Sequence, residues 1–412
     1  MISQDTFKLV FDSQRIKIQG KNWGVEREMN SHLTHATGFA SIVTGLRRCG
    51  KSTLMMQFLE ANFKEKALFL NFEDPRLAYF EMDDFARLYA EIVSRNTNLL
   101  FFDEIQIVKG WEVFVNQLLR EDFLVFITGS NASLLSKELG THLTGRHFST
   151  ELFPFSYNEF LAFFKTSPSE KTFLDYLQKG GMPDYLRTGY GKYLNDLLDD
   201  IIIRDVAIRH GLRDVMSIRQ LTVYLLSNIG NLVSANGLSG MFGIKSTTTL
   251  LQYFSFLADA YLLEFVPMFD YSIKKQIRNP QKVYAIDVGL YHQNKIVFSP
   301  NHGAVLENMV YLHLRKKYQE IFYFQNNGEC DFVTTINGNP EDLFQVCHDL
   351  NDMNLHREVN GLFQAMDFFK KNKGYIITLN QTDLFTKDEK TIKVIPAWKW
   401  MSESYVTEIT NK

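Results

Sequence analysis

Four short apolar runs stand out in the first third of the chain, each followed by glycine or polar residues. They cover residues 40–43, 67–72, 98–103 and 123–128, and stretches with helical spacing separate them. Strands that are buried on both faces of a parallel sheet are nearly continuously apolar. The pattern therefore predicts an α/β fold with a parallel sheet, to which the apolar alternation over 143–156 adds a fifth strand.

Residues 45–52 read Gly-Leu-Arg-Arg-Cys-Gly-Lys-Ser and match the phosphate-binding pattern G-x-x-x-x-G-K-[ST]. The apolar run 40–43 leads into them and a helix-forming stretch at 53–60 leads out, so the motif has the strand, loop and helix that its chemistry needs. Gly45 and Gly50 let the backbone curl until successive N–H groups point at a phosphate. The following helix adds the positive end of its dipole at the same place.

Two side chains of this motif have further roles on a triphosphate. The Lys51 ammonium would reach the β- and γ-phosphates, and the Ser52 hydroxyl would bind Mg²⁺. The chain is therefore predicted to bind ATP together with Mg²⁺. The predicted nucleotide-binding residues are Gly45, Leu46, Arg47, Arg48, Cys49, Gly50, Lys51, Ser52 and Thr53.

A second motif, Asn-Leu-Leu-Phe-Phe-Asp-Glu-Ile-Gln at residues 98–106, ends a predicted buried strand in two carboxylates. Asp103 at the strand tip would hold Mg²⁺ next to Ser52. Glu104, one residue further out, would orient or deprotonate the water that attacks the γ-phosphorus. The alternative is a strand that ends in a solvated Asp-Glu turn, and the phosphate loop nearby favours the catalytic interpretation.

The polar ends of two further strands supply more candidates. Ser130 and Asn131 follow the strand at 123–128 and would contact the attacking water or the γ-phosphate. For Asn131, capping of a helix at 132–139 is an equally weighted alternative. Arg146 stands at the entrance of the fifth strand, where an arginine can project into the nucleotide site of a neighbouring subunit. That role requires a homo-oligomer, and a surface arginine paired with a carboxylate is the open alternative.

These motifs occur in an order that is typical of a known protein family. After the phosphate loop come Asn-Phe-Glu-Asp-Pro-Arg, Phe-Phe-Asp-Glu-Ile-Gln, Thr-Gly-Ser-Asn, and Leu-Thr-Gly-Arg followed by Leu-Phe-Pro-Phe-Ser-Tyr-Asn-Glu-Phe. From about residue 25 to its end, the chain resembles a widespread group of prokaryotic AAA+-type ATPases with a C-terminal domain of unknown function. The resemblance implies phosphate-loop, Mg²⁺-binding, catalytic-glutamate, sensor and finger roles for the residues above, and it implies membership of the hydrolytic branch of P-loop proteins.

The sequence predicts a P-loop domain at residues 1–155, followed by two further regions in the middle of the chain. Residues 156–210 are expected to be helical, with a turn forced by Gly-Gly-Met-Pro, and to form a lid or linker. Residues 211–300 resemble a winged helix, because helical patterns are followed by apolar strands at 262–268 and 282–286 that would form a wing.

Basic residues of this winged-helix-like region are the candidates for contact with DNA phosphates. Residues 201–300 hold ten Lys and Arg against six Asp and Glu. The third helical pattern has few basic residues, so sequence-specific reading of bases is weakly supported. A domain used for packing and regulation is the alternative. The residues predicted to contact DNA are Lys245, Lys274, Lys275, Arg278 and Lys282.

Residues 301–412 contain a predicted helix with Glu307, a strand with Asp331 and a strand with Gln345. This layout resembles that of PD-(D/E)xK nucleases, in which two acidic groups hold Mg²⁺ and a lysine helps to activate water. Cys347 stands where lysine should be. The resemblance therefore implies an α/β nuclease-like fold with a degenerate site, and nuclease activity is not expected.

Composition limits the partners and the location. The net charge of −3 gives no global attraction to nucleic acid, so any such binding must come from a local patch. Three scattered cysteines argue for a reducing cytoplasm and against a disulfide framework or zinc ribbon. No stretch approaches the roughly 18–20 apolar residues that span a bilayer, and the first residues lack a signal-peptide pattern. A cytoplasmic protein without a membrane partner is expected.

Together these features favour an ATP hydrolase of the AAA+ type. Its ATP cycle would move the winged-helix and nuclease-like domains relative to each other. The alternative is an ATP-regulated DNA-binding protein or a nuclease that uses the C-terminal domain.

Overall fold

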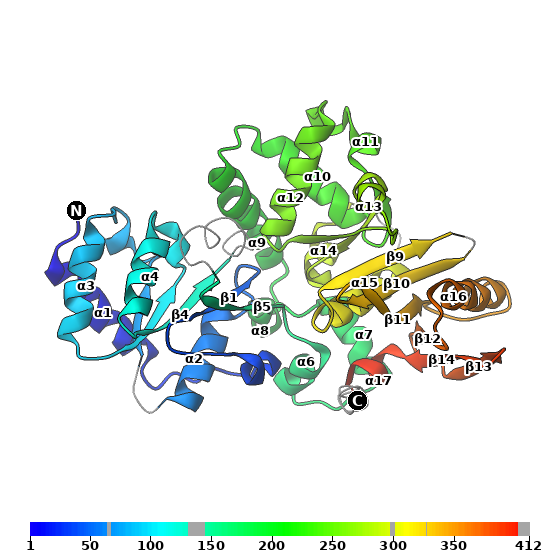
Figure 1. Ribbon diagram of the computed structural model, residues 1–412, viewed down its shortest axis with the longest axis horizontal. Helices are drawn as coiled ribbons and strands as arrows, with labels where there is room; N and C mark the ends of the chain where they lie inside the picture. The colour runs from blue at the N-terminus through cyan, green and yellow to red at the C-terminus, as the bar shows by residue number, and fades with distance from the viewer. Residues whose placement is uncertain (64–66, 131–144, 297–300, 327, 403–412) are drawn as a thin grey trace. The chain divides into compact units, whose positions relative to one another are not determined.

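The computed structural model describes residues 1–63, 67–130, 145–296, 301–326 and 328–402. It divides into two compact units, each with its own sheets and hydrophobic core (Figure 1). The first unit consists of Met1–Phe153 and Asp259–Tyr261, and the second consists of Pro154–Ala258 and Leu262–Lys412.

The first unit is built on a five-stranded sheet in which every pairing is parallel. The strands lie in the order β2-β3-β4-β1-β5. Their bounds are β1 Ala40–Gly45, β2 Leu68–Asn71, β3 Leu99–Asp103, β4 Leu124–Gly129 and β5 His147–Leu152. The predicted parallel α/β sheet is confirmed. Because β4 lies between β3 and β1, the carboxyl ends of these three strands meet at one edge of the sheet.

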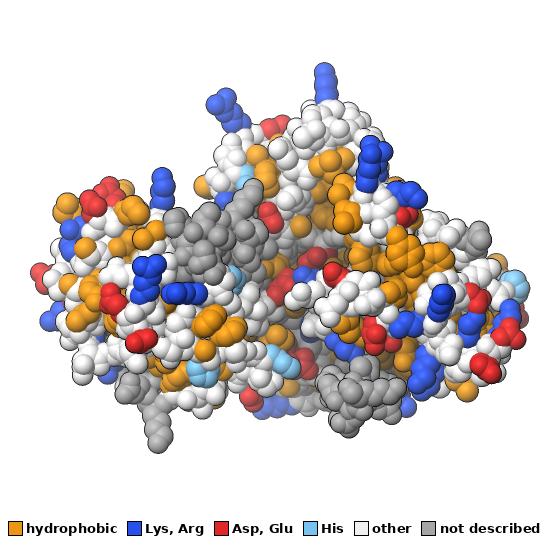
Figure 2. Space-filling view, in the orientation of Figure 1, with side chains coloured by type: hydrophobic (Ala, Val, Ile, Leu, Met, Phe, Trp, Pro, Cys, Tyr) orange, Lys and Arg blue, Asp and Glu red, His pale blue; other side chains and the backbone are white. Residues whose placement is uncertain are grey.

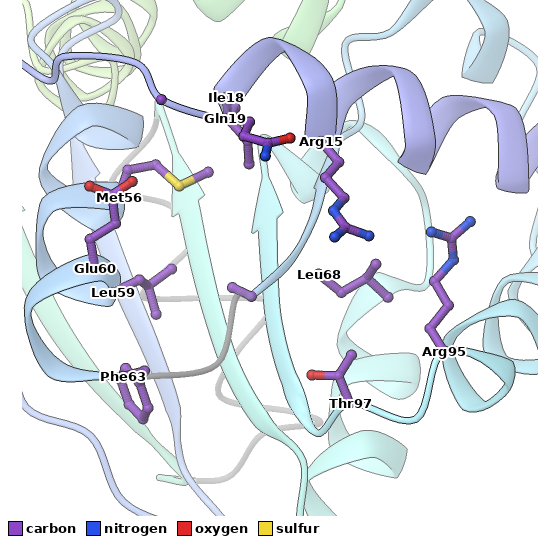
Figure 3. A pocket seen from close by; sticks show the side chains of 12 residues that line it. Arg15, Ile18, Gln19, Met56, Leu59, Glu60, Phe63, Leu68, Arg95 and Thr97 are labelled. Carbon is purple, nitrogen blue, oxygen red and sulfur yellow. The ribbon is translucent and has the colours of Figure 1, made fainter.

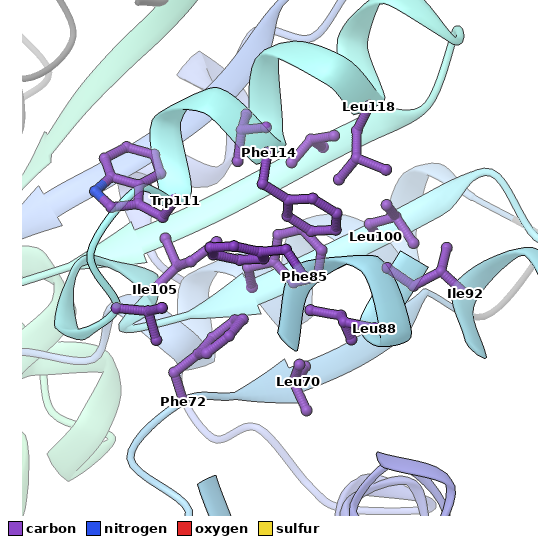
Figure 4. Close-up of a cluster of buried hydrophobic side chains, with 14 of the residues drawn as sticks. Leu70, Phe72, Phe85, Leu88, Ile92, Leu100, Ile105, Trp111, Phe114 and Leu118 are labelled. Carbon is purple, nitrogen blue, oxygen red and sulfur yellow. The ribbon is translucent and has the colours of Figure 1, made fainter. Parts of the chain in front are cut away.

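Helices cover both faces of this sheet. They are α1 Gln4–Ile18, α2 Lys51–Asn62, α3 Asp84–Ser94 and α4 Trp111–Arg120, joined by the 3₁₀ turns η1 Glu28–His32, η2 Pro75–Leu77 and η3 Ile105–Ile107. On one face, α1, α3 and α4 pack over alternate strand residues. Leu100 of β3 is one of them and lies beside residues of α3 and α4 in Figure 4. Phe85 of α3 and Phe114 of α4 stack there with ring centroids 4.6 Å apart. On the other face, the ring centroids of Phe58 in α2 and Phe126 in β4 lie 5.8 Å apart.

The second unit opens with a series of helices, as predicted for residues 156–210. They are α6 Tyr157–Phe164, α7 Glu170–Lys179, α8 Pro183–Thr188, α9 Lys192–Asp200 and the π-helical turn η5 Ile201–Ile208. The first helix starts with a capping box, in which Ser156 Oγ accepts from Glu159 N at 3.0 Å and Ser156 N donates to Glu159 Oε2 at 2.8 Å. Among the helices of the described ranges, none is both long enough and apolar enough to cross a bilayer.

The predicted Gly-Gly-Met-Pro turn is a close packing site. The Gly181 N–H donates to Asp287 Oδ2 at 2.6 Å, and a Cβ on Gly181 would lie 2.4 Å from the Phe155 carbonyl oxygen. Asp287 is also the N-cap of α14 Val288–Asn294, since its Oδ1 accepts from Leu290 N at 3.2 Å. The turn therefore fits only glycine and depends on one buried carboxyl group.

Burial of Asp287 predicts a pH dependence of stability. Loss of solvent raises the pKa of this carboxyl from 3.8 to about 6, although backbone N–H donors oppose the shift. The folded chain thus keeps a proton that the unfolded chain has released, so the free energy of unfolding falls as pH rises from about 4 to about 6, by up to about 3 kcal/mol from this group. Asp287→Asn should lack this component of the fall. Urea unfolding of both chains at the two ends of the window measures it, and an equal fall in both would contradict it.

The next part of the second unit combines helices with a small antiparallel sheet. The helices are α10 Val215–Ser227, α11 Ala235–Leu238, η6 Met241–Gly243, α12 Thr247–Asp259 and α13 Ile273–Arg278. The strands are β6 Leu232–Val233, β7 Leu263–Val266 and β8 Gln281–Ala285, in the order β6-β8-β7. The two strands predicted at 262–268 and 282–286 therefore pair, and the short helix α13 lies in the connection between them. Their role as a wing stays a prediction.

The last part of the second unit is a six-stranded mixed sheet in the order β13-β14-β12-β11-β10-β9. Its strands are β9 Glu320–Gln325, β10 Glu329–Ile336, β11 Asn339–Val346, β12 Lys373–Thr378, β13 Asp383–Lys387 and β14 Lys390–Pro396. Its helices are α15 His302–Arg315, α16 Leu355–Phe369 and α17 Ala397–Ser402. β9, β10 and β11 are antiparallel neighbours, whereas β12 pairs with β11 in parallel after the crossover helix α16.

The two sheets of the second unit are joined. Met268 forms a parallel bridge with Tyr323 of β9. Phe269 N donates to Tyr323 O at 2.7 Å, and Tyr323 N donates to Pro267 O at 3.1 Å. These backbone bonds connect the regions 211–300 and 301–412, whose predicted separation into two domains stays a prediction.

Candidate nucleotide-binding site

The phosphate loop turns between β1 and α2 in a conformation that its glycines allow. Gly45 has a φ of +144° and Gly50 a φ of +103°, both in the region that favours glycine. A Cβ on Gly45 would lie 2.2 Å from the Leu152 carbonyl oxygen at the end of β5. Helix α2 begins at Lys51, so its first N–H groups, which have no partner inside the helix, face the loop.

The Lys51 side chain lies inside this loop and is buried. Its Nζ donates to the carbonyl oxygens of Gly45 at 3.1 Å and Leu46 at 3.0 Å. The same ammonium lies 3.8 Å from Glu104 Oε1. The structure therefore brings the phosphate-loop cation and the proposed catalytic carboxylate together, as the two motifs predict.

Asp103 is the most highly connected carboxylate of the site. Its Oδ1 accepts from Ser52 Oγ at 2.8 Å and from the Thr128 hydroxyl, and its Oδ2 accepts from Asn71 Nδ2 at 2.9 Å. Burial raises the pKa of this carboxyl, against the hydrogen bonds and the Lys51 charge that lower it. Three neighbouring strands thus fix one carboxylate beside the phosphate-loop hydroxyl, which is an arrangement of hard oxygen donors that suits Mg²⁺.

Glu104 leaves the end of β3 in a left-handed backbone conformation, with φ 56° and ψ 36°. Such a conformation is uncommon for a non-glycine residue. Its Oε2 accepts from Gln106 Nε2 at 2.5 Å. Burial raises the pKa of Glu104, and the Lys51 charge opposes that shift. The carboxylate is therefore held in place next to the loop and is a better proton acceptor than an exposed glutamate.

Two arginines anchor the loop. Buried Arg27 donates from Nη1 to the Cys49 carbonyl at 2.7 Å and from Nη2 to the Phe153 carbonyl at 2.6 Å. Arg47 Nη1 donates to Glu73 Oε1 at 3.0 Å. The Cys49 thiol is buried, and loss of solvent raises its pKa, so its role in the loop is that of a small packed residue.

The remaining candidates of the ATP site are placed differently. Ser130 is buried directly after β4, at the same strand edge as Asp103. Asn131 lies outside the described residues. Arg146 is exposed and precedes β5, and its carbonyl accepts from Ala40 N at 3.0 Å. It therefore stands at the amino edge of the sheet, opposite the phosphate loop of its own chain, and its finger role stays a prediction.

Sequence reasoning missed three residues of the site. Asn71 and Thr128 contact Asp103 from the ends of β2 and β4, and both could have been found as polar residues that follow apolar strand runs. Arg27 had no such signal, because it lies in an irregular segment before β1 and reaches the loop only in the folded chain.

A separate cavity lies near the amino ends of β2 and β3 in the same sheet (Figure 3). Its volume is about 560 Å³, and it is lined by apolar residues such as Leu59 and by Arg95. Leu68 and Thr97, which also line it, stand at or before the first residues of β2 and β3. Since the phosphate loop and Asp103 follow the last residues of their strands, this cavity is distinct from the nucleotide site. Arg95 is already paired with Asp12 at 2.8 Å.

The structure corrects one prediction of a DNA contact. Lys282 is only 8% exposed, and its Nζ donates to Asp331 Oδ1 at 2.7 Å and to Glu307 Oε1 at 3.0 Å. Burial alone would lower the pKa of this ammonium, but attraction to the two carboxylates raises it above its usual range. Lys282 is thus a charged internal residue and is unable to contact DNA.

The other residues predicted to contact DNA are exposed, whereas those predicted for the nuclease-like site are mostly buried. Lys245, Lys274, Lys275 and Arg278 are exposed, the last three on α13. Gln345 lies beside Asp331, whose N–H donates to Gln345 Oε1 at 3.1 Å. Cys347 follows the end of β11, and its thiol donates to Asp349 O at 3.2 Å. The structure therefore brings Glu307, Asp331 and Gln345 together, and Cys347 lies two residues after Gln345.

Two family models and two relatives match this chain. Residues 38–161 match the family model of an AAA domain, and residues 170–299 match that of a domain of unknown function. An uncharacterised protein of Methanocaldococcus jannaschii is 34% identical over 390 residues, 87% of each chain. One of Haemophilus influenzae is 30% identical over 358 residues, 81% of this chain and 88% of the other. The chain belongs to their family.

Within this family member, the first unit holds an AAA domain of the P-loop type, which agrees with its parallel sheet. A solved structure of AMPPCP-bound DnaA from Aquifex aeolicus matches at 12% identity, over 56% of this chain and 85% of that chain, with a TM-score of 0.26. A similarity that low supports no argument about the present chain. The AAA domain assignment therefore rests on the family model and on the geometry of the phosphate loop.

Proposed function

We propose that the AAA domain binds ATP with Mg²⁺ and hydrolyses it. The observation that carries the proposal is the hydrogen bond of 2.8 Å between Ser52 Oγ and Asp103 Oδ1. It brings the hydroxyl of the phosphate loop and the carboxylate of β3 to one point, where both are suited to the same magnesium ion. When bound, that ion neutralises charge on the β- and γ-phosphates.

The chain's own residues supply the rest of the chemistry. Backbone N–H groups of the loop would surround the phosphates, and Lys51 would turn from the loop carbonyls to the phosphate oxygens. Glu104 would orient the attacking water and accept its proton, and Gln106 keeps the Glu104 carboxylate in position. Steady-state phosphate release by the full chain tests the proposal. We expect repeated turnover that stops when EDTA removes Mg²⁺, and ATP binding without any turnover would reject hydrolysis.

Arg146 is proposed to complete the site of a neighbouring subunit. The support is its exposure at the sheet edge away from its own phosphate loop. Arg146→Ala and Glu104→Gln should each lose most turnover, by about 10³-fold or more for an arginine finger. When the two variants are mixed, random assembly places an intact Glu104 next to an intact Arg146 at about a quarter of the interfaces. Recovery of ATPase activity on mixing is therefore expected, and no recovery would reject the role in trans.

DNA binding by the second unit is the second candidate function. One support is the combination of helices α10, α11 and α12 with the β6-β8-β7 sheet, which is consistent with a winged helix. The other is the set of exposed cations on α13, in the connection between β7 and β8. Figure 2 has Lys and Arg side chains beside an apolar area in the region where α13 lies in Figure 1. Backbone phosphates rather than bases would be the target, since α12 Thr247–Asp259 contains no Lys or Arg.

The salt dependence of DNA affinity tests this second function. Changing Lys274 and Lys275 to alanine removes two phosphate contacts, so the slope of log affinity against log salt should decrease by about 2. The matched control changes Lys387 and Lys393, two exposed lysines of β13 and β14, and should leave the slope unchanged. Equal effects of the two pairs would mean that α13 is not the contact surface.

Movement driven by ATP is proposed to involve the second unit as one body. The segment after β7 is bonded to β9 through Phe269 and Tyr323, and Lys282 of β8 pairs with residues of α15 and β10. Separating the winged-helix-like and nuclease-like regions would break these bonds and expose buried charges. We therefore expect the two regions to keep their mutual contacts throughout the ATP cycle, in contrast to the sequence-based expectation that they move relative to each other.

A further inference from the structure

The buried charges around Lys282 decide whether the nuclease-like region holds a metal ion. The resemblance to PD-(D/E)xK nucleases implies Mg²⁺ between Glu307 and Asp331. In the structure, each of these carboxylates already accepts from the Lys282 ammonium, at 3.0 Å and 2.7 Å. All three side chains are nearly buried, with 10% of Lys282, 15% of Glu307 and 7% of Asp331 exposed. The cation between the carboxylates is thus part of the chain.

Two further donors reach the acidic pair. Glu307 Oε1 accepts from the Tyr284 hydroxyl at 2.6 Å, and Asp331 Oδ2 accepts from Val346 N at 2.8 Å. Magnesium requires oxygen ligands at about 2.0–2.1 Å in near-octahedral geometry. A metal at this place would have to expel a buried ammonium and break its two ion pairs.

Gln345, the third residue of the nuclease-like layout, is bonded to other groups. Gln345 Oε1 accepts from Asp331 N at 3.1 Å, and Gln345 Nε2 donates to Glu358 Oε2 at 2.7 Å. Among the described residues, no group of three or more His, Cys, Asp or Glu is placed to hold a metal. The donor set of this region therefore does not fit the Mg²⁺ that its resemblance implies.

We infer that the Lys282 ammonium takes the place of the divalent cation, so that Glu307 and Asp331 form a metal-free ion cluster and not a catalytic centre. The lysine comes from β8 of the small sheet, whereas its partners come from α15 and β10 of the other region. The cluster joins these three elements. The nuclease-like fold of this chain serves as a scaffold that neither binds Mg²⁺ nor cuts phosphodiester bonds.

Manganese binding to the full chain tests this inference. The Asp103→Asn background removes the metal contact of the AAA domain, and calorimetry without nucleotide then reports on the second unit alone. We expect no heat of Mn²⁺ binding in this background. Adding Lys282→Met leaves two adjacent buried carboxylates, which should lower the melting temperature and create a Mn²⁺ site. Millimolar Mn²⁺ should then raise the melting temperature again, and a further Glu307→Gln change should abolish that rise.

Two controls keep the result decisive. Lys282→Arg preserves the positive charge and should remain insensitive to Mn²⁺. If Lys282→Met fails to fold in metal-free buffer, the calorimetry of the chain with natural Lys282 still decides the question. Mn²⁺ binding there that Asp331→Asn removes, or cleavage of plasmid DNA that Asp331→Asn removes, would overturn the inference. Neither result depends on ATP hydrolysis, so failure of the proposed ATPase function would be visible separately.

Discussion

Glu104→Gln is expected to slow ATP hydrolysis by about 10²–10⁴-fold while ATP binding is retained, as for loss of a general base. The amide has the shape of the carboxylate but is unable to accept a proton from water. In the folded chain, Glu104 lies 3.8 Å from Lys51 and accepts from Gln106, so it is held where the terminal phosphate would be attacked. Single-turnover phosphate release and fluorescent-nucleotide binding, measured on the same preparation, separate the two effects.

Glu73→Gln is the matched control for this prediction. Glu73 is another carboxylate close to the loop, but it is paired with Arg47 and its side chain is 39% exposed. An exposed ion pair contributes about 0–1 kcal/mol, so turnover should change by only a few-fold. If Glu104→Gln hydrolysed ATP at the natural rate, Glu104 would not be the base. Equal loss in both variants would point to general electrostatics of the loop in place of one proton acceptor.

Gly181→Ala is expected to destabilise the second unit by about 3 kcal/mol, the upper end of the range for overpacking. The added Cβ would lie 2.4 Å from the Phe155 carbonyl oxygen and 2.7 Å from its nitrogen. Both are backbone atoms and are fixed by the hydrogen bond from Phe155 N to Gly181 O at 2.8 Å. Relief of the overlap must therefore displace the turn and weaken its bond to Asp287. Urea unfolding followed by tryptophan fluorescence or circular dichroism gives the change in free energy.

Gly303→Ala provides the comparison for this change. Gly303 lies in the first turn of α15, where the nearest atom to an added Cβ is 3.9 Å away. Alanine there should be neutral or stabilise by up to about 1 kcal/mol, since it reduces the freedom of the unfolded chain. Unchanged stability of Gly181→Ala relative to Gly303→Ala would mean that the turn tolerates a side chain and that its packing is wrongly described.

The parts of the fold that follow from local pattern were predictable. Phe101 and Phe102 belong to an apolar run that only a strand covered on both faces would carry, and the phosphate loop is a contiguous motif with a mechanism. The carboxyl ends of β1 and β3 lie at one edge of such a sheet, so these two motifs alone predict that Ser52 lies near Asp103, as it does. Local sequence was sufficient there because the chemistry is concentrated at strand ends.

Contacts between distant segments were not predictable. Lys282 follows three other basic residues within nine positions, so composition favoured a surface patch, whereas its partners lie 25 and 49 residues further along the chain. Arg27 likewise reaches Phe153 across 126 positions. Neither residue has a motif, and only the packing of separate elements gives each its partners. The cysteine at position 347, where the resemblance expects lysine, predicts a degenerate nuclease-like site. That an internal ammonium occupies the place of the metal follows only from the fold, which brings Lys282 to Glu307 and Asp331.

Isothermal titration of the full chain with ATP in the presence of Mg²⁺ tests the central claim most directly. Lys51→Ala, which removes the ammonium that would bind the β- and γ-phosphates, is the paired measurement. The account predicts a saturable heat of one nucleotide per chain for the natural protein and none for Lys51→Ala at the same concentrations. No heat from the natural chain, or equal heat from both chains, would contradict it.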